Sequence, residues 1–305
     1  MTDPAFVSVI IPVFRDWPRL MLCLNKLAVQ TLPAGRFEVV VVNNDPSDPC
    51  PFVLPASNMR IIGEARKSSY AARNAGIREA KGEVLAFTDS DCLPDARWLA
   101  AGLECLNQGL SDLVGGRIDF VFKNPGSAAE LLDASTHMDN ERSIKRHSGA
   151  VTANLFVKRK VFVAIGLFDR RVQSGGDIEF TQRASSQGFL LRYCIGAVVS
   201  HPTRTLKEQV GKAYRTGKGL LRVEQRRPAG LLFKLKMVLL HLLPVTNPAR
   251  IFKALQRYRK CNTWMFARVV ALSVIVNLVK IAGIIASMVL LPFVLSTGRS
   301  PKTIQ

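Results

Sequence analysis

The chain has 305 residues and a mass of 33.6 kDa, enough for one large domain or two modest ones with a substantial core. Hydrophobic residues make up 48% and charged residues 21% of the chain, which excludes a disordered or collagen-like protein. The net charge of +19 is uneven, because residues 202–305 hold 19 basic and 2 acidic residues whereas residues 1–201 hold 23 and 21. This basic segment adjoins the longest apolar runs and lacks the interleaved aromatic residues of a stacking platform for bases. We therefore expect it to bind an anionic membrane surface and not nucleic acid.

The first hundred residues alternate between strand and helix patterns. Short apolar runs at 7–14, 37–44, 59–64 and 83–91 predict strands, and apolar residues at helical spacing predict helices over 17–30 and 68–82. This alternation predicts an α/β fold with a mostly parallel sheet and helices on both faces. The ligand crevice of such a sheet lies outside the carboxyl ends of its strands. The polar residues at those ends are Asn43, Asn44, Asp45, Asp89 and Asp91.

The middle of the chain is less regular. We expect a strand over 113–122, a polar stretch over 124–150, a strand followed by a short helix over 152–169, a helix over 175–189, and a closing strand over 191–201.

The last hundred residues change in character. A basic helix is expected over 204–227, and the apolar run 231–243 is too short to span a bilayer and is interpreted as interfacial. Residues 269–295 would form a helix of roughly 40 Å against a hydrocarbon core of roughly 30 Å, so we expect a transmembrane helix there. A re-entrant or interfacial pair of helices is the alternative. With one span, the excess of positive charge places residues 1–260 on the cytoplasmic side of the cell membrane.

The cysteines and the N-terminus agree with a cytoplasmic catalytic part. The six cysteines show neither a CxxC pair nor zinc-finger spacing, so we expect reduced thiols and not a disulfide framework. The sequence MTDPAF has no basic region followed by an apolar stretch long enough for a signal peptide.

Two short motifs carry candidate chemistry. Asp89 and Asp91 end an apolar strand one residue apart, where both can reach Mg²⁺ or Mn²⁺, although a polar loop with capping aspartates gives the same pattern. Asp177 follows a glycine pair at the start of a helix and could act as a general base. The alternative there is simple helix capping beside an i,i+4 pair of Glu179 and Arg183.

Taken together, the motifs resemble those of family 2 glycosyltransferases with a GT-A fold, over about residues 6–225. The matching segments are VSVIIPVF, VVVNNDPSD, AARNAGI, KGEVLAFTDSDC, TANLFVKRKVFVAIGLFD, GGDIEFTQRASSQGF and a strand that ends at His201.

The resemblance implies a role for each matching position. Asp177 would be the general base of an inverting displacement, and Asp89, Asp91 and His201 would hold the metal ion. The expected donor-binding residues are Pro12, Val13, Asn43, Asn44, Arg73, Asp89, Ser90 and Asp91.

Two positions depart from the family pattern. Asn43 and Asn44 stand where an acidic pair is usual, so a neutral amide oxygen would accept the hydrogen bond from the base. Gly176 stands where the family has the glutamate that precedes its catalytic aspartate.

The resemblance implies a GT-A domain over 1–225, with a nucleotide-sugar half of about 1–115 and an acceptor half of about 116–225, followed by a membrane-associated helical region over 226–305. We expect transfer from a nucleotide sugar, such as a UDP-sugar, to a hydroxyl of a glycan or a lipid-linked or membrane-proximal acceptor. The alternative is a non-catalytic subunit that binds sugar nucleotides or acts as a scaffold in a membrane polysaccharide assembly complex.

Overall fold

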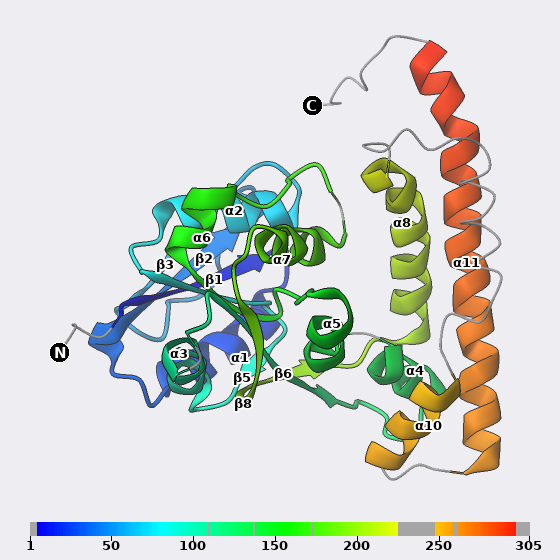
Figure 1. The fold of residues 1–305 in the computed structure, drawn as a ribbon, viewed down its shortest axis with the longest axis horizontal. Coiled ribbons are helices and arrows are strands. Elements are labelled where there is room, and N and C mark those ends of the chain that lie inside the picture. The colour runs from blue at the N-terminus through cyan, green and yellow to red at the C-terminus, as the bar shows by residue number, and fades with distance from the viewer. Residues whose placement is uncertain are drawn as a thin grey trace. The chain divides into compact units, whose positions relative to one another are not determined.

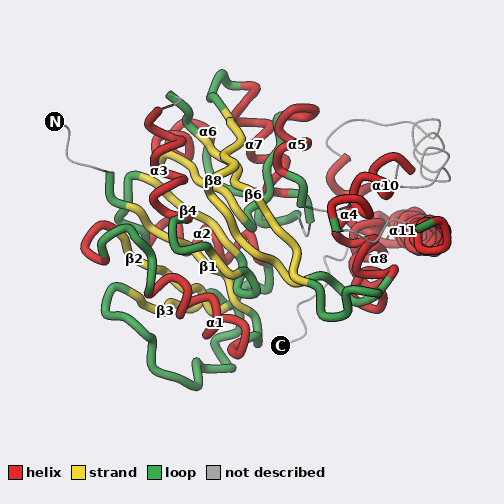
Figure 2. Tube along the Cα trace, turned by 90° about the horizontal axis from the view of Figure 1, so that it is seen from below, coloured by secondary structure: helices red, strands yellow, loops and turns green. Residues whose placement is uncertain are grey.

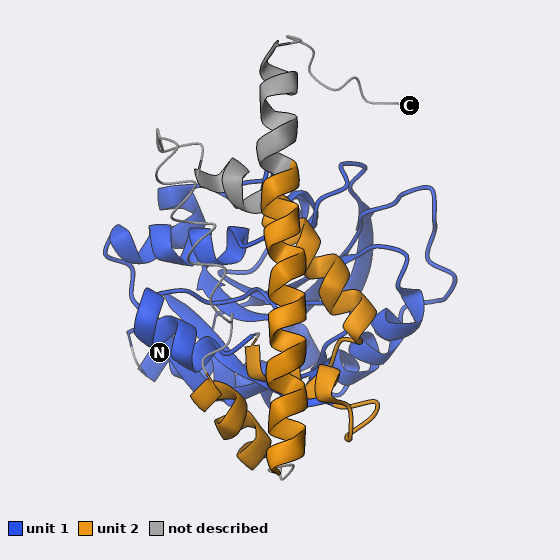
Figure 3. Ribbon diagram, turned by 90° about the vertical axis from the view of Figure 1, so that its right-hand side faces the viewer, with its two compact units in different colours: residues 1–121, 138–202 blue, residues 122–137, 203–305 orange. Residues whose placement is uncertain are grey.

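The computed structural model describes residues 5–108, 110–136, 138–172, 174–224, 248–258 and 262–296, with only the backbone over 219–224 and 287–296. It divides the chain into two compact units, residues 1–121 with 138–202 and residues 122–137 with 203–305 (Figure 3). These units differ from the expected boundary at residue 225. The basic helix and the stretch 122–137 both belong to the second unit.

The first unit is built on one eight-stranded mixed sheet of order β3-β2-β1-β4-β7-β6-β8-β5 (Figures 1 and 2). Its strands are β1 (Val7–Val13), β2 (Phe37–Asn43), β3 (Met59–Gly63), β4 (Val84–Thr88), β5 (Leu93–Pro94), β6 (Leu113–Val121), β7 (Asn154–Lys158) and β8 (Leu191–Pro202). The run β3-β2-β1-β4 is parallel, as the sequence predicts for the nucleotide half. Beyond β4, the strand β7 is antiparallel to both its neighbours, β6 and β8 are parallel, and β5 is antiparallel to β8.

Helices cover both faces of this sheet (Figure 2). One apolar core packs α1 (Trp17–Ala28) and α3 (Trp98–Gln108) against it, and a second core packs α2 (Ser69–Glu79), α6 (Arg159–Ile165) and α7 (Gly176–Ser186) against the other face. A 3-10 turn (Ala34–Arg36) precedes β2, and α5 (Asn140–His147) lies beside β6 and β8. Every residue of β2 and β4 is buried, as expected of central strands that read as continuous apolar runs.

One expectation about the cysteines is wrong. Cys105 in α3 and Cys194 in β8 form a disulfide, whereas Cys23, Cys50 and Cys92 are free thiols. The two bonded residues are 89 positions apart, and only the packing of α3 on β8 brings them together. Such a pairing leaves no spacing signal in the sequence.

The second unit contains four helices within its described residues: α4 (Ala128–Thr136), α8 (Leu206–Glu224), α10 (Pro248–Arg257) and α11 (Thr263–Ser296). Helices α8 and α11 pack with their backbones in direct contact, since a Cβ on Gly217 would overlap the carbonyl oxygen of Lys280 and a Cβ on Gly283 that of Tyr214. The basic helix expected over 204–227 is α8. The apolar run 231–243 lies outside the described residues.

Helix α11 contains the expected span over 269–295. Among the described residues, Thr263–Ala286 is the one helical segment long and apolar enough to cross a membrane, with a mean hydropathy of 2.4.

Candidate active site

The carboxyl ends of β1 and β2 meet at the edge where the donor base is expected. Val13 pairs with Asn43 in register, and the backbone N–H of Asn44 donates to the carbonyl of Val13 at 2.8 Å. Pro12 is half-buried beside them. Parallel pairing therefore brings four of the predicted donor-binding residues together.

The two asparagine side chains are already used in organising this loop. Asn43 donates to the carbonyl of Asp48 at 2.9 Å and accepts from the N–H of Asp45 at 3.0 Å. Asn44 donates to two backbone carbonyls, at 2.8 and 2.7 Å, and its oxygen accepts from the N–H of Ser68 at 3.0 Å. Each residue is only 5% exposed. Their direct contact with a base, which the sequence predicts, therefore stays a prediction.

A charged pair that the sequence reasoning did not use lies at the same edge. The carboxylate of Asp45 accepts from Ser47 at 2.6 Å and from Arg15 at 2.7 Å, and these bonds hold the pKa of Asp45 below its ordinary value. The side chain of Phe14, between the two strand ends, is exposed.

Asp91 and His201 lie together because β5 pairs with β8. Leu93 is opposite Ser200 in this antiparallel pair, so the residues just before Leu93 and just after Ser200 become neighbours. The distance from Nε2 of His201 to Oδ1 of Asp91 is 3.7 Å, and Arg19 lies 3.6 Å from the other oxygen of Asp91.

The protonation of His201 suits a metal ligand. Its Nδ1 lies 2.6 Å from the carbonyl oxygen of Pro202, which can only accept, so Nδ1 carries the proton. Nε2 is then the ring nitrogen that faces Asp91, and the imidazole is 2% exposed and packed against Phe120. A second-sphere carbonyl that fixes the tautomer is the usual support of a metal-binding histidine. One carboxylate and one imidazole therefore fit a divalent cation whose other positions are filled by phosphate oxygens and water.

Cys92 shares this cluster, since its thiol, Asp91 and His201 all lie within 4.8 Å of one another. Burial, together with the charges of Asp89 and Asp91, raises the pKa of Cys92 well above its ordinary value. A buried neutral thiol is a poor ligand for Mg²⁺ or Mn²⁺. Asp89 is not part of the cluster.

Asp89 is instead bonded to Arg73 of α2. In this ion pair the side chain of Arg73 is buried, at 6% exposure, and that of Asp89 is partly exposed. The guanidinium carbon of Arg73 lies 5.6 Å from the centre of the Tyr70 ring, one turn earlier in the helix. Ser90 is half-buried between the two aspartates. Arg73 and Asp89, two of the predicted donor-binding residues, therefore lie together, and their contact with a donor stays a prediction.

Asp177 lies in the first turn of α7, where three donors orient its carboxylate. The hydroxyl of Tyr70 donates to Oδ1 at 3.1 Å and the N–H of Ile178 to the same oxygen at 3.0 Å, while the N–H of Thr152 donates to Oδ2 at 3.2 Å. Because a carboxylate offers roughly four lone-pair directions, Oδ2 keeps room for one further donor. A substrate hydroxyl could occupy that position.

Tyr70 explains the departure at position 176. Its hydroxyl accepts from the N–H of Gly176 at 2.8 Å and of Asp177 at 3.3 Å. A Cβ on residue 176 would lie 2.9 Å from the Tyr70 ring, closer than real contacts allow. The preceding Gly175 has a φ of +81°, a left-handed conformation that favours glycine. The buried tyrosine therefore takes the space that the side chain of a glutamate at 176 would need.

Tyr70 is the candidate site residue that the sequence did not indicate. It contacts both Arg73, which holds Asp89, and Asp177, so the two predicted carboxylate motifs are connected through two side chains of α2. Burial raises the pKa of the Tyr70 phenol above its ordinary value of 10.0, which keeps it protonated as a donor to Asp177. The co-occurrence of Gly176 with an aromatic residue in α2 is the one sequence signal that could have indicated it.

This mixed α/β sheet with helices on both faces, and with acidic residues and a buried histidine at its strand ends, is the architecture of glycosyltransferases with a GT-A fold. The family model described as Glycosyl transferase family 2 matches residues 8–165, and the chain belongs to that family.

Known proteins support the same assignment. Glycosyltransferase AglE of Haloferax volcanii is 39% identical over 224 residues, which cover 72% of this chain and 74% of that protein. The dolichyl N-acetyl-alpha-D-glucosaminyl phosphate 3-beta-D-2,3-diacetamido-2,3-dideoxy-beta-D-glucuronosyltransferase of Methanococcus voltae is 22% identical, covering 77% of this chain and 81% of that protein.

The fold is also found in solved structures. The mannosyltransferase PcManGT from Pyrobaculum calidifontis, solved in complex with GDP-Man and Mn²⁺, superposes with a TM-score of 0.57 at 20% identity, covering 95% of this chain and 87% of that one. At this level of identity the likeness establishes the GT-A fold and no more.

Proposed function

We propose that this glycosyltransferase moves a sugar from a nucleotide-sugar donor, such as a UDP-sugar, to a hydroxyl of a lipid-linked or membrane-proximal acceptor, with inversion at the anomeric carbon. The observation that carries the proposal is the contact path from Asp89 through Arg73 and Tyr70 to Asp177, beside the pair of Asp91 and His201. The relative from Methanococcus voltae is named for a dolichyl-linked acceptor, and α11 has the length and hydropathy of a membrane span.

The donor would bind across the strand ends of the first unit. The loop organised by Asn43 and Asn44 would receive the base, and Arg73 would approach the diphosphate while it holds Asp89 in place. Asp91 and His201 would hold Mg²⁺ or Mn²⁺, while Asp89 would stay paired with Arg73 on the side of the diphosphate. That ion, when bound, would supply the positive charge that neutralises the departing nucleoside diphosphate.

Asp177 would take the proton from the acceptor hydroxyl as that oxygen attacks the anomeric carbon. The bond between this carbon and the diphosphate oxygen breaks as the new glycosidic bond forms, so one displacement inverts the configuration. The three donors around Asp177 fix the direction of its carboxylate, and Oδ2 is the oxygen with room for the hydroxyl. By the positive-inside rule, the excess of positive charge on the N-terminal side of α11 would put this site on the cytoplasmic side of the cell membrane.

A donor screen tests the proposal. The purified full-length chain in detergent is incubated with Mn²⁺, a lipid-linked acceptor and each of a panel of UDP- and GDP-sugars, and release of nucleoside diphosphate is measured. We expect one donor to be turned over, the activity to be lost with EDTA and restored with Mn²⁺, and the product anomer to be inverted by NMR. Donor binding without turnover across the panel would instead indicate a non-catalytic subunit.

A further inference from the structure

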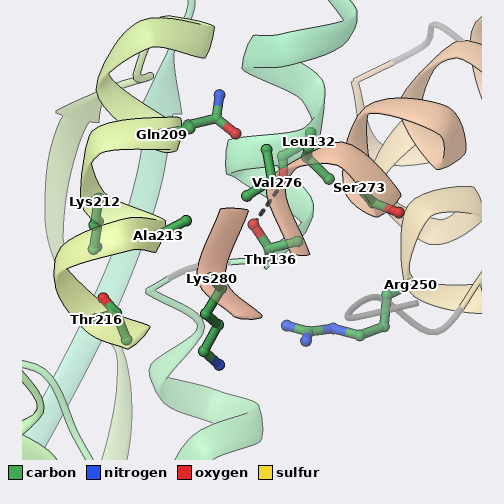
Figure 4. A pocket seen from close by; sticks show the side chains of 10 residues that line it. All are labelled: Leu132, Thr136, Gln209, Lys212, Ala213, Thr216, Arg250, Ser273, Val276 and Lys280. Carbon is green, nitrogen blue, oxygen red and sulfur yellow. Dashed lines mark hydrogen bonds between the residues drawn. The ribbon is translucent and has the colours of Figure 1, made fainter. Parts of the chain in front are cut away.

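A cavity of about 130 Å³ lies within the second unit, among α4, α8, α10 and α11 (Figure 4). The residues that line it are Leu132, Thr136, Gln209, Lys212, Ala213, Thr216, Arg250, Ser273, Val276 and Lys280. Helices from distant parts of the sequence therefore contribute to one partly open cavity, to which the candidate active site assigns no role.

The lining is mostly apolar, but three of its residues are cationic. Lys212, Arg250 and Lys280 contribute to it from three different helices, and none of the described residues that line it carries a carboxylate. Figure 4 shows the side chains of Arg250 and Lys280 converging on the same end of the cavity. Three cations around a small volume favour an anion with several charges or several oxygens, which is the character of a phosphate group.

The remaining polar groups offer acceptors. Gln209 is 3% exposed, and its amide nitrogen donates to the carbonyls of Ala129 and Arg204. Its buried Oε1 has no hydrogen-bond partner among the described residues. Ser273 and Thr136 donate their hydroxyl protons to backbone carbonyls of their own helices. A ligand that fits therefore combines negative charge with a hydroxyl donor, as a phosphate monoester or a glycosyl phosphate does.

The character of α11 indicates that this phosphate belongs to a lipid. Its buried face mixes the polar residues Ser273 and Asn277, at 2% and 3% exposure, with apolar residues such as Ile284, whereas Ile275, Leu278 and Ile285 on its other side are about half exposed. An apolar exposed face with polar groups turned inward is the arrangement of a helix in a bilayer. An ionisable residue such as Lys280 in an apolar span marks a binding site more often than a structural one.

We propose that this cavity binds the phosphate of a polyprenyl-type lipid phosphate, with Lys212, Arg250 and Lys280 as the cationic ligands and Gln209 as acceptor of a phosphate or sugar hydroxyl. This inference deepens the proposed function, on which it rests for a lipid-linked acceptor, by assigning the site that holds the acceptor's anionic group.

Binding of defined lipids to the full-length chain in detergent micelles tests this proposal without any turnover. The probes are a polyprenyl monophosphate, the uncharged polyprenol of the same chain length, and inorganic phosphate. The test variant is the double substitution Arg250→Gln with Lys280→Met, which removes two charges. The control is Lys253→Gln with Arg268→Met, which removes the same charges from exposed positions on the same two helices.

We expect wild type and the control to bind the phosphate lipid at least about tenfold more tightly than the alcohol, and the test variant to lose that preference. Equal affinity of test and control variants for the phosphate lipid would overturn the proposal. Displacement by inorganic phosphate at comparable concentration would overturn the assignment to a lipid. If the double variant does not fold, Lys280→Met alone is compared with Arg268→Met.

The two proposals fail in different ways. A chain that binds the phosphate lipid through this cavity but turns over no donor contradicts the proposed function alone. A chain that turns over donor, with the lipid preference unchanged in the test variant, contradicts this site alone.

Discussion

Replacing Tyr70 by phenylalanine tests how the candidate base is held. The substitution keeps the ring, which packs against Phe168 and under Arg73, and removes only the hydroxyl. That hydroxyl makes three hydrogen bonds: it donates to the Asp177 carboxylate at 3.1 Å and accepts from the N–H groups of Gly176 and Asp177 at 2.8 and 3.3 Å. All three act on the first turn of α7.

The magnitude follows from these bonds. A hydrogen bond to a charged group contributes about 1.5–3 kcal/mol, and a buried donor left without a partner costs about 1–3 kcal/mol. Because the two N–H groups lie at a helix start, where water can replace part of the loss, we expect a fall of about 2 kcal/mol in the free energy of unfolding. If the poorer orientation of Asp177 raises the activation free energy by about 1.4 kcal/mol, kcat falls about tenfold.

The assay measures kcat and donor KM under saturating acceptor, together with urea unfolding. The control is Tyr214→Phe, which removes the same hydroxyl group from a half-exposed tyrosine of α8. We expect kcat to fall about tenfold in Tyr70→Phe while donor KM changes little. An unchanged kcat, or an effect confined to donor KM, would refute the view that Tyr70 positions Asp177.

Three further predictions concern the metal pair, the glycine and one carboxylate. Asp91→Asn and His201→Gln should each raise the Mn²⁺ concentration for half-maximal activity about tenfold or more, measured by Mn²⁺ titration of turnover; an unchanged titration curve would remove both as ligands. Gly176→Ala should destabilise by about 1–3 kcal/mol because its Cβ meets the Tyr70 ring, whereas Gly35→Ala, with nothing within 4 Å of its Cβ, should not; urea unfolding compares them. Burial alone would raise the pKa of Glu38, but bonds from Ser8, the N–H of Lys81 and Arg60 outweigh it and hold that pKa below 4.5. A depressed pKa gives stability that is present above the unfolded value and is lost as pH falls through the folded value, so Glu38→Gln should destabilise at pH 7 and progressively less below about pH 4. Equal destabilisation at both pH values would contradict this.

The central strands could be predicted because their residue types favour one conformation, a strand buried on both faces. The runs that form β1, β2 and β4 are apolar and largely β-branched, and strands buried on both faces require such sequences. In contrast, β5 is only the pair Leu93–Pro94, and it exists because β8 pairs with it. No local pattern encodes a two-residue strand, yet this strand is what brings Asp91 to His201.

The same distinction holds for the candidate site. Asp89, Asp91 and Asp177 are visible in the sequence because each follows a recognisable strand or helix boundary. Tyr70 is not, since an aromatic residue in a helix is usually part of the core, and its contact with Asp177 depends on the packing of α2 against α7 across 107 residues. The second unit could not be outlined for the same reason, because residues 122–137 join it by packing from the middle of the chain.

The most direct test of the central claim compares Asp177→Asn with wild type for two properties at once: binding of the donor with Mn²⁺, and transfer of the sugar. Glu179→Gln, the same chemical change two residues further along α7 in a side chain paired with Arg183, is the matched control. We predict that Asp177→Asn binds donor and Mn²⁺ as wild type does while its transfer rate falls by at least about a hundredfold, and that Glu179→Gln retains transfer. Transfer at the wild-type rate by Asp177→Asn, or an equal loss of donor binding and transfer, would contradict the assignment of Asp177 as the base of this site.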